Sequence, residues 1–275
     1  MPTPPQFATI GPIWLVGCGN LGRAMLDGWL RAGVPARALT VINPSPRNLP
    51  QDIGYLSAPK DGLPTPAILV LAVKPTRLGE VALSLALWAP GSLVISVLAG
   101  AKLARLAALF PHSRVIRALP NTPARIGQGT TLLAADRPCA ADVATATALM
   151  SALGATHWID EAIFDAATAI AASSPAWLFR WTAALGHAGA VTGVDPALAV
   201  RLASEAMAGS AAYALGAGRT LDDLAREVAS PGGMTQAGLD RLDSGGALER
   251  LLLETVAAAV DRAAVLAREA DDDPR

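Results

Sequence analysis

The stretch IWLVGCGNLG at residues 13–22 constrains the fold more than any other part of the sequence. An apolar, strand-like run leads into Gly17, Gly19 and Gly22, and a helical pattern follows, so G-x-G-x-x-G stands in the strand, turn and helix context that it requires. The three glycines permit a tight turn, close approach of the backbone to a pyrophosphate, and close packing of helix on strand. The stretch therefore predicts a dinucleotide-binding loop, which Cys18, Asn20 and Leu21 complete.

The first half of the chain alternates strand-like and helical segments. Further strands are expected in LTVIN, AILVLAV, SLVISVLAG and RVIRALP, an alternation typical of βαβ units and a parallel sheet. From about residue 160 the sequence instead predicts alanine-rich helices, and Asp195 followed by Pro196 has the pattern of a helix start. We therefore expect an α/β fold, with a Rossmann-type dinucleotide-binding domain at residues 1–160 and an all-helical domain at 161–275.

Composition and charge limit the possible partners. Hydrophobic residues make up 52% of the 275 positions, charged residues 16%, and the net charge is −1. This balance gives no reason to expect nucleic acid or an anionic membrane as a partner, and no uninterrupted apolar run reaches the roughly 18 residues of a membrane span. The first residues lack a signal-peptide pattern, which favours a cytoplasmic protein. Two cysteines and three histidines without ligand spacing predict no metal site.

The helices expected in the second half are rich in small residues, as in AMAGSAAYALGA. Such helices pack closely but have thin apolar faces, so a second subunit is expected to complete their core. A monomeric helical bundle is the alternative.

The segments that follow the expected strands indicate which dinucleotide binds. Residues 41–47, VINPSPR, carry no carboxylate where an NAD enzyme places Asp or Glu, and Ser45 and Arg47 favour NADP over NAD. A polar turn with a solvated Arg47 is the alternative. Strand ends line the ligand crevice of an open α/β sheet, so the other candidate cofactor ligands are Asn43, Ala72, Val73, Lys74, Pro75, Val97, Leu98 and Ala99.

Six motifs in order along the chain carry a family resemblance: VGCGNLG, AVKP, SVLAG, RALPNTPA, ASSPAW and SPGGMTQAGL. Together they resemble the pyrroline-5-carboxylate reductase family. The resemblance implies reduction of 1-pyrroline-5-carboxylate to L-proline by hydride transfer, the last step of proline biosynthesis, with NADPH favoured over NADH. It also implies a homodimer, or a higher homo-oligomer built from dimers, whose helical domains interleave, and an active site where domains of different subunits meet.

The SPGGMTQAGL segment is the candidate substrate site. The substrate of the family is a cyclic imine with a carboxylate, and a Pro-Gly-Gly break that exposes backbone amides at the start of a helix suits an anion. Ser230 adds a hydroxyl donor, Gly232 and Gly233 permit close approach, and Met234 keeps its amide. Thr235 is the candidate catalytic residue, donating a hydrogen bond to the ring nitrogen, although the alternative role of helix N-cap is compatible with it. Asn121 is expected to shape the pocket, or otherwise to cap a turn.

Four residues depart from the family pattern: Leu119, Ala172, Trp177 and Met234. The bulk of Ala172 and Trp177 leaves a related cyclic imine open as the substrate. A reductase of 3-hydroxy acids is disfavoured because residues 161–275 contain no lysine to serve as its catalytic base. A dinucleotide-binding regulator without catalysis is the alternative from another functional class.

Overall fold

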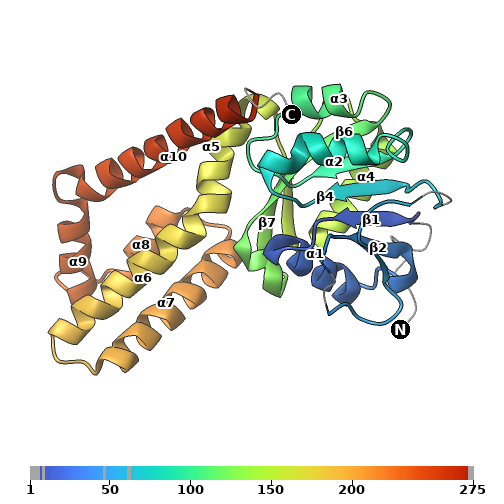
Figure 1. Cartoon of the computed structure of the whole chain (residues 1–275). Helices are drawn as coiled ribbons and strands as arrows, with labels where there is room; N and C mark the ends of the chain where they lie inside the picture. Colours follow the sequence, from blue (N-terminus) through green and yellow to red (C-terminus); the bar gives the residue numbers. More distant parts are fainter. Residues whose placement is uncertain (1–6, 8–9, 46–47, 61–62, 272–275) are drawn as a thin grey trace. The chain divides into compact units, whose positions relative to one another are not determined.

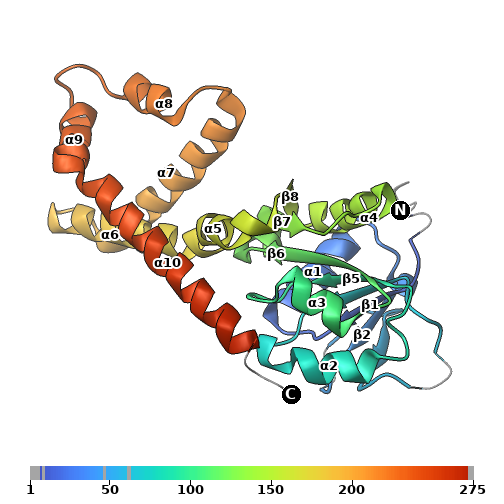
Figure 2. The ribbon, with the colours of Figure 1, turned by 90° about the horizontal axis from the view of Figure 1, so that it is seen from above.

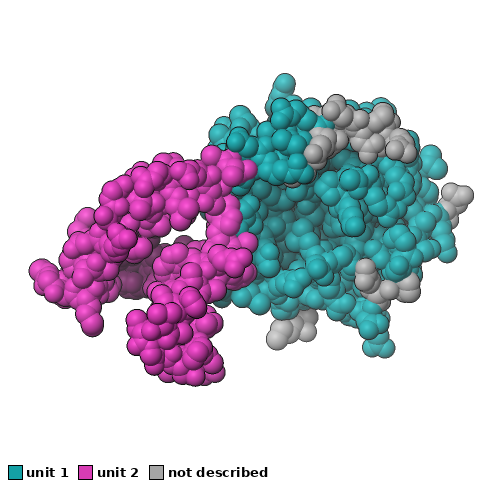
Figure 3. Space-filling view, turned by 60° about the vertical axis from the view of Figure 1, so that its left-hand side comes forward, with its two compact units in different colours: residues 1–173, 259–275 teal, residues 174–258 magenta. Residues whose placement is uncertain are grey.

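The computed structural model describes the chain except for residues 1–6, 8–9, 46–47, 61–62 and 272–275. It divides into two compact units, which are described separately: unit 1 is Met1–Ser173 with Ala259–Arg275, and unit 2 is Ser174–Ala258 (Figure 3). Unit 1 holds the sheet, whose last strand ends at Trp158. The boundary expected between residues 160 and 161 stays a prediction.

Unit 1 is built on one eight-stranded sheet in the order β3-β2-β1-β4-β5-β6-β7-β8 (Figure 1). Neighbouring strands pair in parallel except β6 and β7, which are antiparallel. The expected parallel sheet is confirmed for β1, β2, β4, β5 and β6, whereas β3, β7 and β8 are additional strands. The strands are β1 Ile13–Val16, β2 Leu39–Ile42, β3 Gly54–Leu56, β4 Ile68–Leu71, β5 Leu93–Ser96, β6 Arg114–Pro120, β7 Gly129–Ala134 and β8 Gly154–Trp158.

Helices cover both faces of the sheet (Figure 2). Every residue of β1, β4 and β5 is buried, because a parallel strand between two helical layers has no solvated face. On one face, the buried Trp29 of α1 donates its Nε1–H to the Leu149 carbonyl of α4 at 3.0 Å, and on the other α2 and α3 pack over Trp14 and Leu69. These helices are α1 Asn20–Arg31, α2 Leu78–Leu85, α3 Leu103–Leu109 and α4 Ala140–Ser151, followed by the short α5 Phe164–Thr168.

A buried guanidinium joins β6 to the segments that pack beside it. Arg117 is 3% exposed, and it donates to Glu161 Oε1 at 3.2 Å and to Asp165 Oδ1 at 2.7 Å. Its Cζ lies 3.9 Å from the centroid of the Phe164 ring. Glu161 Oε1 also accepts the backbone N–H of Leu103, the first residue of α3, at 2.7 Å. Arg117 and Glu161 together therefore connect β6, α3 and α5.

Unit 2 is entirely helical, which confirms the expected helical second half. The expected helix start at Asp195 is confirmed, because its Oδ1 accepts the Leu198 N–H at 2.9 Å and Pro196 is the first residue of α7. Small residues bring α6 and α7 together: a Cβ at Gly186 would lie 2.8 Å from Val200 Cγ2. The helices are α6 Ser174–Val191, α7 Pro196–Ala217, α8 Leu221–Val228, α9 Met234–Asp243 and α10 Ala247–Asp271, of which the part to Ala258 belongs to this unit.

Large apolar side chains lie exposed on α6 and α10. Phe179 is 59% exposed, Trp181 47%, Leu251 61% and Leu253 64%. The helical run Glu161–Val191 is also long and apolar enough to cross a membrane by length and composition, with only 17% of its most apolar window buried. Unit 2 thus has apolar faces that its own helices do not cover.

We expect Arg117→Met to lower the free energy of unfolding by on the order of 3 kcal/mol, because it removes the cation between two partly buried carboxylates. Arg137→Met is the matched control: Arg137 is 93% exposed beside Asp136, so its loss should change stability by under about 0.5 kcal/mol. Urea unfolding at one fixed protein concentration measures both. Equal losses in the two variants would contradict a structural role for the buried cation.

Candidate functional site

The fingerprint glycines occupy three different environments at the end of β1. Gly17 has a φ of +92°, and a Cβ on it would lie 2.5 Å from the Ala72 carbonyl oxygen of the neighbouring strand end. A Cβ on Gly22 would lie 2.5 Å from Gly17 O, so this glycine lets α1 pack on the turn. A Cβ on Gly19 would meet nothing within 4 Å. Gly17 and Gly22 are therefore required by the fold, whereas Gly19 leaves an open space above the loop.

The open space lies at the N-terminus of α1. Gly19 is the N-cap residue, no side chain caps the helix there, and the first turn contains no acidic residue. Asn20, the first helical residue, is exposed, while Leu21 packs against the core. Free backbone amides and the positive end of the helix dipole make this helix start a site for a phosphate group.

A cavity of about 530 Å³ opens beside this loop at the carboxyl ends of β1, β2 and β4. The structure brings seven of the expected cofactor ligands together in its lining: Gly17, Cys18, Gly19, Asn43, Ala72, Val73 and Lys74. Sequence reasoning missed the ten other lining residues: Val16, Ile42, Pro44, Ser57, Ala58, Pro59, Arg77, Glu80, Val81 and Ser84. Residues 57–59 directly follow β3. A strand expected at residues 54–56 would have placed them at the same edge of the sheet as the other cavity residues.

Asn43 holds the two loops of the cavity together. It is 8% exposed and stands directly after β2, where its Oδ1 accepts the Cys18 N–H at 3.1 Å and its Nδ2 donates to Ser45 O at 2.6 Å. The Tyr55 hydroxyl of β3 donates to Asn43 O at 3.0 Å. Both ends of the amide are therefore engaged within the protein, and Ser45 is tied to the fingerprint loop through it. Arg47, the other expected ligand of this turn, lies outside the described residues.

Charged side chains line the opposite wall of the cavity. Lys74 follows β4, and Pro75 begins a short 3₁₀ turn that ends at Arg77. Arg77 forms an ion pair with Glu80 of α2 at 2.6 Å. The hydrogen bond from Arg77 lowers the pKa of the Glu80 carboxyl, and Glu80 in turn raises the pKa of Arg77, so both remain charged near neutral pH.

The segment after β5 is placed differently from the cavity-lining residues. Val97 donates its N–H to Leu71 O at 3.0 Å and buries its side chain on one face of the sheet, while Leu98 is buried on the other face. Ala99 is exposed. Val97 and Leu98 can therefore meet a ligand only through their backbone.

Both groups of the Asn121 side-chain amide form hydrogen bonds with other parts of unit 1. Its Oδ1 accepts the Thr130 N–H at 2.9 Å, and its Nδ2 donates to Ala171 O at 2.8 Å. Ala171 lies in the π-helical turn Ala169–Ser173, and Pro175 lacks the N–H that would otherwise bond this carbonyl in an α-helix. The segment at residues 173–175 therefore combines the end of a π-helical turn with the start of α6, and Asn121 supplies the Ala171 carbonyl with the donor that Pro175 lacks.

The SPGG segment of unit 2 forms a turn that leads into α9. Gly233 donates its N–H to Ser230 O at 2.9 Å, and Gly232 has a φ of +71°, which glycine adopts without strain. Gly233 is the N-cap residue of α9, so the expectation that Thr235 caps this helix is wrong: Thr235 is the second residue of α9. Its exposed hydroxyl bonds to none of the residues that the structure describes, and Met234 is 94% exposed.

Two family models match different parts of the chain. Residues 161–266 match the family model described as pyrroline-5-carboxylate reductase dimerisation, and residues 12–100 match the model described as NADP oxidoreductase, coenzyme F420-dependent. The chain is 34% identical to pyrroline-5-carboxylate reductase of Pisum sativum, over 89% of this chain and 92% of that one. It is 32% identical to the Pseudomonas aeruginosa enzyme of the same name, over 94% and 97%.

Solved structures show the same fold. The chain is similar to the pyrroline-5-carboxylate reductase structure from Coxiella burnetii, with a TM-score of 0.86 and 28% identity over 94% of this chain and 99% of that one. It is also similar to the Plasmodium falciparum pyrroline carboxylate reductase solved with NADP bound, with a TM-score of 0.83 and 24% identity over 93% and 98%.

Two glycine substitutions separate the roles of the fingerprint loop. Gly17→Ala should destabilise the protein by about 1–3 kcal/mol because of the positive φ and the close carbonyl. Gly19→Val should lower the free energy of unfolding by no more than about 1 kcal/mol, since valine is a poorer N-cap residue than glycine, yet raise the Kd for NADPH at least about tenfold by filling the open space. Fluorescence titration and urea unfolding test these outcomes, and wild-type NADPH affinity in Gly19→Val would place the phosphates elsewhere.

Proposed function

Because the chain belongs to the pyrroline-5-carboxylate reductase family, we propose that it reduces 1-pyrroline-5-carboxylate to L-proline with NADPH, the last step of proline biosynthesis. The open space above Gly19 is the observation that carries the proposal. It lies at a helix start without acidic residues, and of the three fingerprint glycines Gly19 alone has room beside it for a phosphate group. We assign the cofactor domain to residues 1–160 and the dimerisation and substrate domain to 161–275.

The cavity and the loops beside it fit NADP(H); Gly19 and Lys74 line the cavity, whereas Asn20, Leu21 and Ser45 lie in the adjoining loops. The amides of Gly19, Asn20 and Leu21 would hold the pyrophosphate, while Ser45, Arg47 and Lys74 would lie beside the 2′-phosphate. The bound reduced nicotinamide supplies the hydride. The residue directly after β2 is the neutral Asn43, so no carboxylate repels a 2′-phosphate at this position.

The turn before α9 is the proposed carboxylate site. The hydroxyl of Ser230 and the amides of Gly232 and Met234 would face the substrate anion, with the positive end of the α9 dipole behind them. Gly233 donates its N–H to Ser230 O, so it would contribute close approach of the backbone and no donor of its own. The imine becomes an amine by addition of a hydride at carbon and a proton at nitrogen. The Thr235 hydroxyl, which is exposed one residue into α9, would donate a hydrogen bond to this ring nitrogen and orient it.

Asn121 has a different proposed role from that of a direct ligand. Both groups of its amide are engaged with Thr130 and Ala171, so it would act on substrate by fixing the end of β6 rather than by touching the imine. Val97, Leu98 and Ala99 would likewise contribute backbone and the small Ala99 side chain to the nicotinamide end of the cofactor.

A homodimer is the proposed assembly. The exposed apolar side chains of α6 and α10 lie within the residues that match the dimerisation family. Covering them with a second copy of the chain removes apolar surface from water, which is the dominant favourable term in association.

The decisive assay follows consumption of NADPH by the purified protein with 1-pyrroline-5-carboxylate. A six-membered cyclic imine that carries the same carboxylate is the competing substrate, because Ala172 and Trp177 depart from the family pattern. We expect the five-membered ring to have the higher kcat/KM. Absence of turnover with both imines, alongside an active reference enzyme, would refute the proposal.

Thr235→Val should lower kcat about 100-fold while leaving the Kd for NADPH unchanged, because it removes one positioned donor and preserves the shape of the side chain. Thr235→Ser keeps the hydroxyl and should retain most of the activity. Stopped-flow turnover with saturating NADPH measures both variants. A wild-type kcat in Thr235→Val would remove the hydroxyl from the reaction.

Asn43→Asp should weaken NADPH binding about tenfold, because a carboxylate oxygen would replace the Nδ2 that donates to Ser45 O and would add negative charge near the 2′-phosphate. NADH should be affected less. Asn48→Asp is the control, since it adds the same charge at an exposed side chain five residues along the chain. Calorimetric titration of both cofactors compares them, and an equal shift for NADPH and NADH would contradict the assignment.

A further inference from the structure

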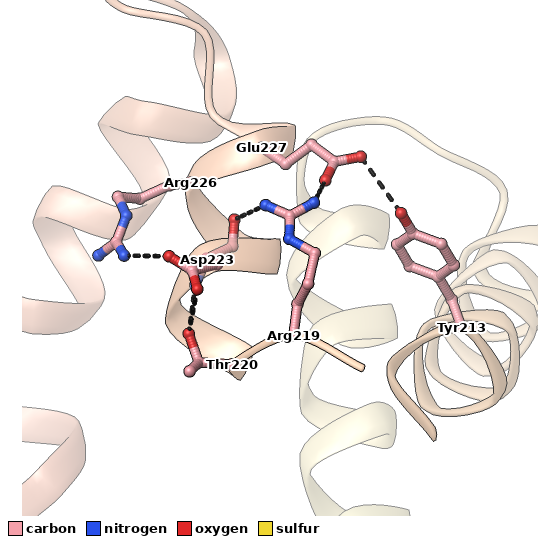
Figure 4. Close-up of polar contacts among 6 residues, drawn as sticks. All are labelled: Tyr213, Arg219, Thr220, Asp223, Arg226 and Glu227. Carbon is pink, nitrogen blue, oxygen red and sulfur yellow. Dashed lines mark hydrogen bonds and ion pairs between the residues drawn. The ribbon is translucent and has the colours of Figure 1, made fainter. Parts of the chain in front are cut away.

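The corner between α7 and α8 in unit 2 carries a network of polar side chains that the proposed reaction does not use (Figure 4). Helix α7 ends at Ala217, Gly218 turns the chain with a φ of +60°, and Thr220 begins α8 as its N-cap. The corner matters because α8 ends at Val228 and leads, through Ala229, directly into the turn at Ser230–Gly233.

One part of the network is local to α8. The Thr220 hydroxyl accepts the Asp223 N–H at 3.1 Å and donates to Asp223 Oδ2 at 2.7 Å, while Arg226 donates to Asp223 Oδ1 at 2.6 Å. These contacts lower the pKa of the Asp223 carboxyl, chiefly through the Thr220 hydroxyl and next through Arg226. They define the first turns of α8 but do not connect it to another helix.

The other part of the network connects helices. Glu227, in the last turn of α8, accepts from the Tyr213 hydroxyl of α7 at 3.2 Å. Its second carboxylate oxygen accepts from the Arg219 guanidinium, which also donates to Asp223 O at 3.4 Å. Figure 4 shows Glu227 between Tyr213 and Arg219. The carboxylate is thus held from both sides, two residues before Ala229.

Apolar packing holds α8 at few points. Leu224 and Ala229 are buried, at 8% and 9% exposed, but Leu221 and Val228 on the same helix are 71% and 65% exposed. Within one chain, α8 therefore has few apolar contacts, and the hydrogen bond between Tyr213 and Glu227 joins its end to α7. Exposed ion pairs add little to global stability, and the effect of this one is therefore expected on local position and not on the fold.

We propose that Glu227 is a positioning residue: by accepting from Tyr213 and Arg219 it fixes the end of α8 on α7, and thereby the position of the turn at residues 230–233. The inference rests on the proposed role of that turn in holding the substrate carboxylate. A displacement of about 1 Å at a binding group can cost up to about 100-fold in rate, so a small shift of α8 is enough to be measured.

Glu227→Ala should raise the KM for 1-pyrroline-5-carboxylate about five- to twentyfold, with the KM for NADPH and the melting temperature close to wild type. Glu227→Gln keeps an acceptor oxygen and should recover part of the loss, and Tyr213→Phe should show a smaller rise. Arg226→Ala is the matched control, because it removes an ion pair of the same helix that does not reach α7. It should behave as wild type.

Amide hydrogen exchange on the full-length protein gives a readout that does not depend on activity. Glu227→Ala should speed exchange at residues 229–237 without changing exchange in the sheet, and Arg226→Ala should not. Wild-type exchange and wild-type KM in Glu227→Ala, or equal effects in Arg226→Ala, would overturn the inference. Faster exchange in a protein that does not reduce the imine would support the positioning role of Glu227 while refuting the proposed substrate.

Discussion

The buried guanidinium of Arg117 is the constraint on which the geometry of unit 1 depends. A guanidinium cannot lose its charge in a protein, so its burial in β6 requires partners, and the fold supplies Glu161, Asp165 and the face of Phe164. Glu161 also holds the first residue of α3. These contacts join β6, the start of α3 and the short α5, and Asn121 follows directly after β6.

Asn121 also satisfies a backbone carbonyl in the segment before α6. Pro175 deprives the Ala171 carbonyl of its α-helical donor, and the Asn121 amide provides one in its place. The π-helical turn at Ala169–Ser173 is thus tied to the sheet just before α6 begins. The sequence predicts that Asn121 shapes the ligand pocket, but in the structure its side-chain amide connects two segments of unit 1. A buried carbonyl left without a donor is costly, which explains this use of the amide.

The two units use their apolar residues in opposite ways. In unit 1 the central strands are buried on both faces, so nearly all their apolar area is covered within the chain. In unit 2 the small residues that let α6 and α7 approach leave thin apolar faces, and Phe179, Trp181 and Leu251 remain exposed. The high hydrophobic fraction of the sequence thus has two sources: a closed core, and an exposed apolar surface within the residues that match the dimerisation family.

The sequence by itself determined the elements whose signals are local: the fingerprint loop, five strands, the helical second half and the start of α7 at Asp195. It missed β3 and β8, which are edge strands whose residues are exposed or half-buried, and β7, which runs antiparallel to β6; none of them has the apolar run of a central parallel strand. Only the tertiary structure decided that Gly233 is the N-cap residue of α9, that the side-chain amides of Asn43 and Asn121 bond to backbone groups, and that Arg77 lines the cavity beside the fingerprint loop. Each of these depends on which distant atoms meet, and residue type alone does not carry that information.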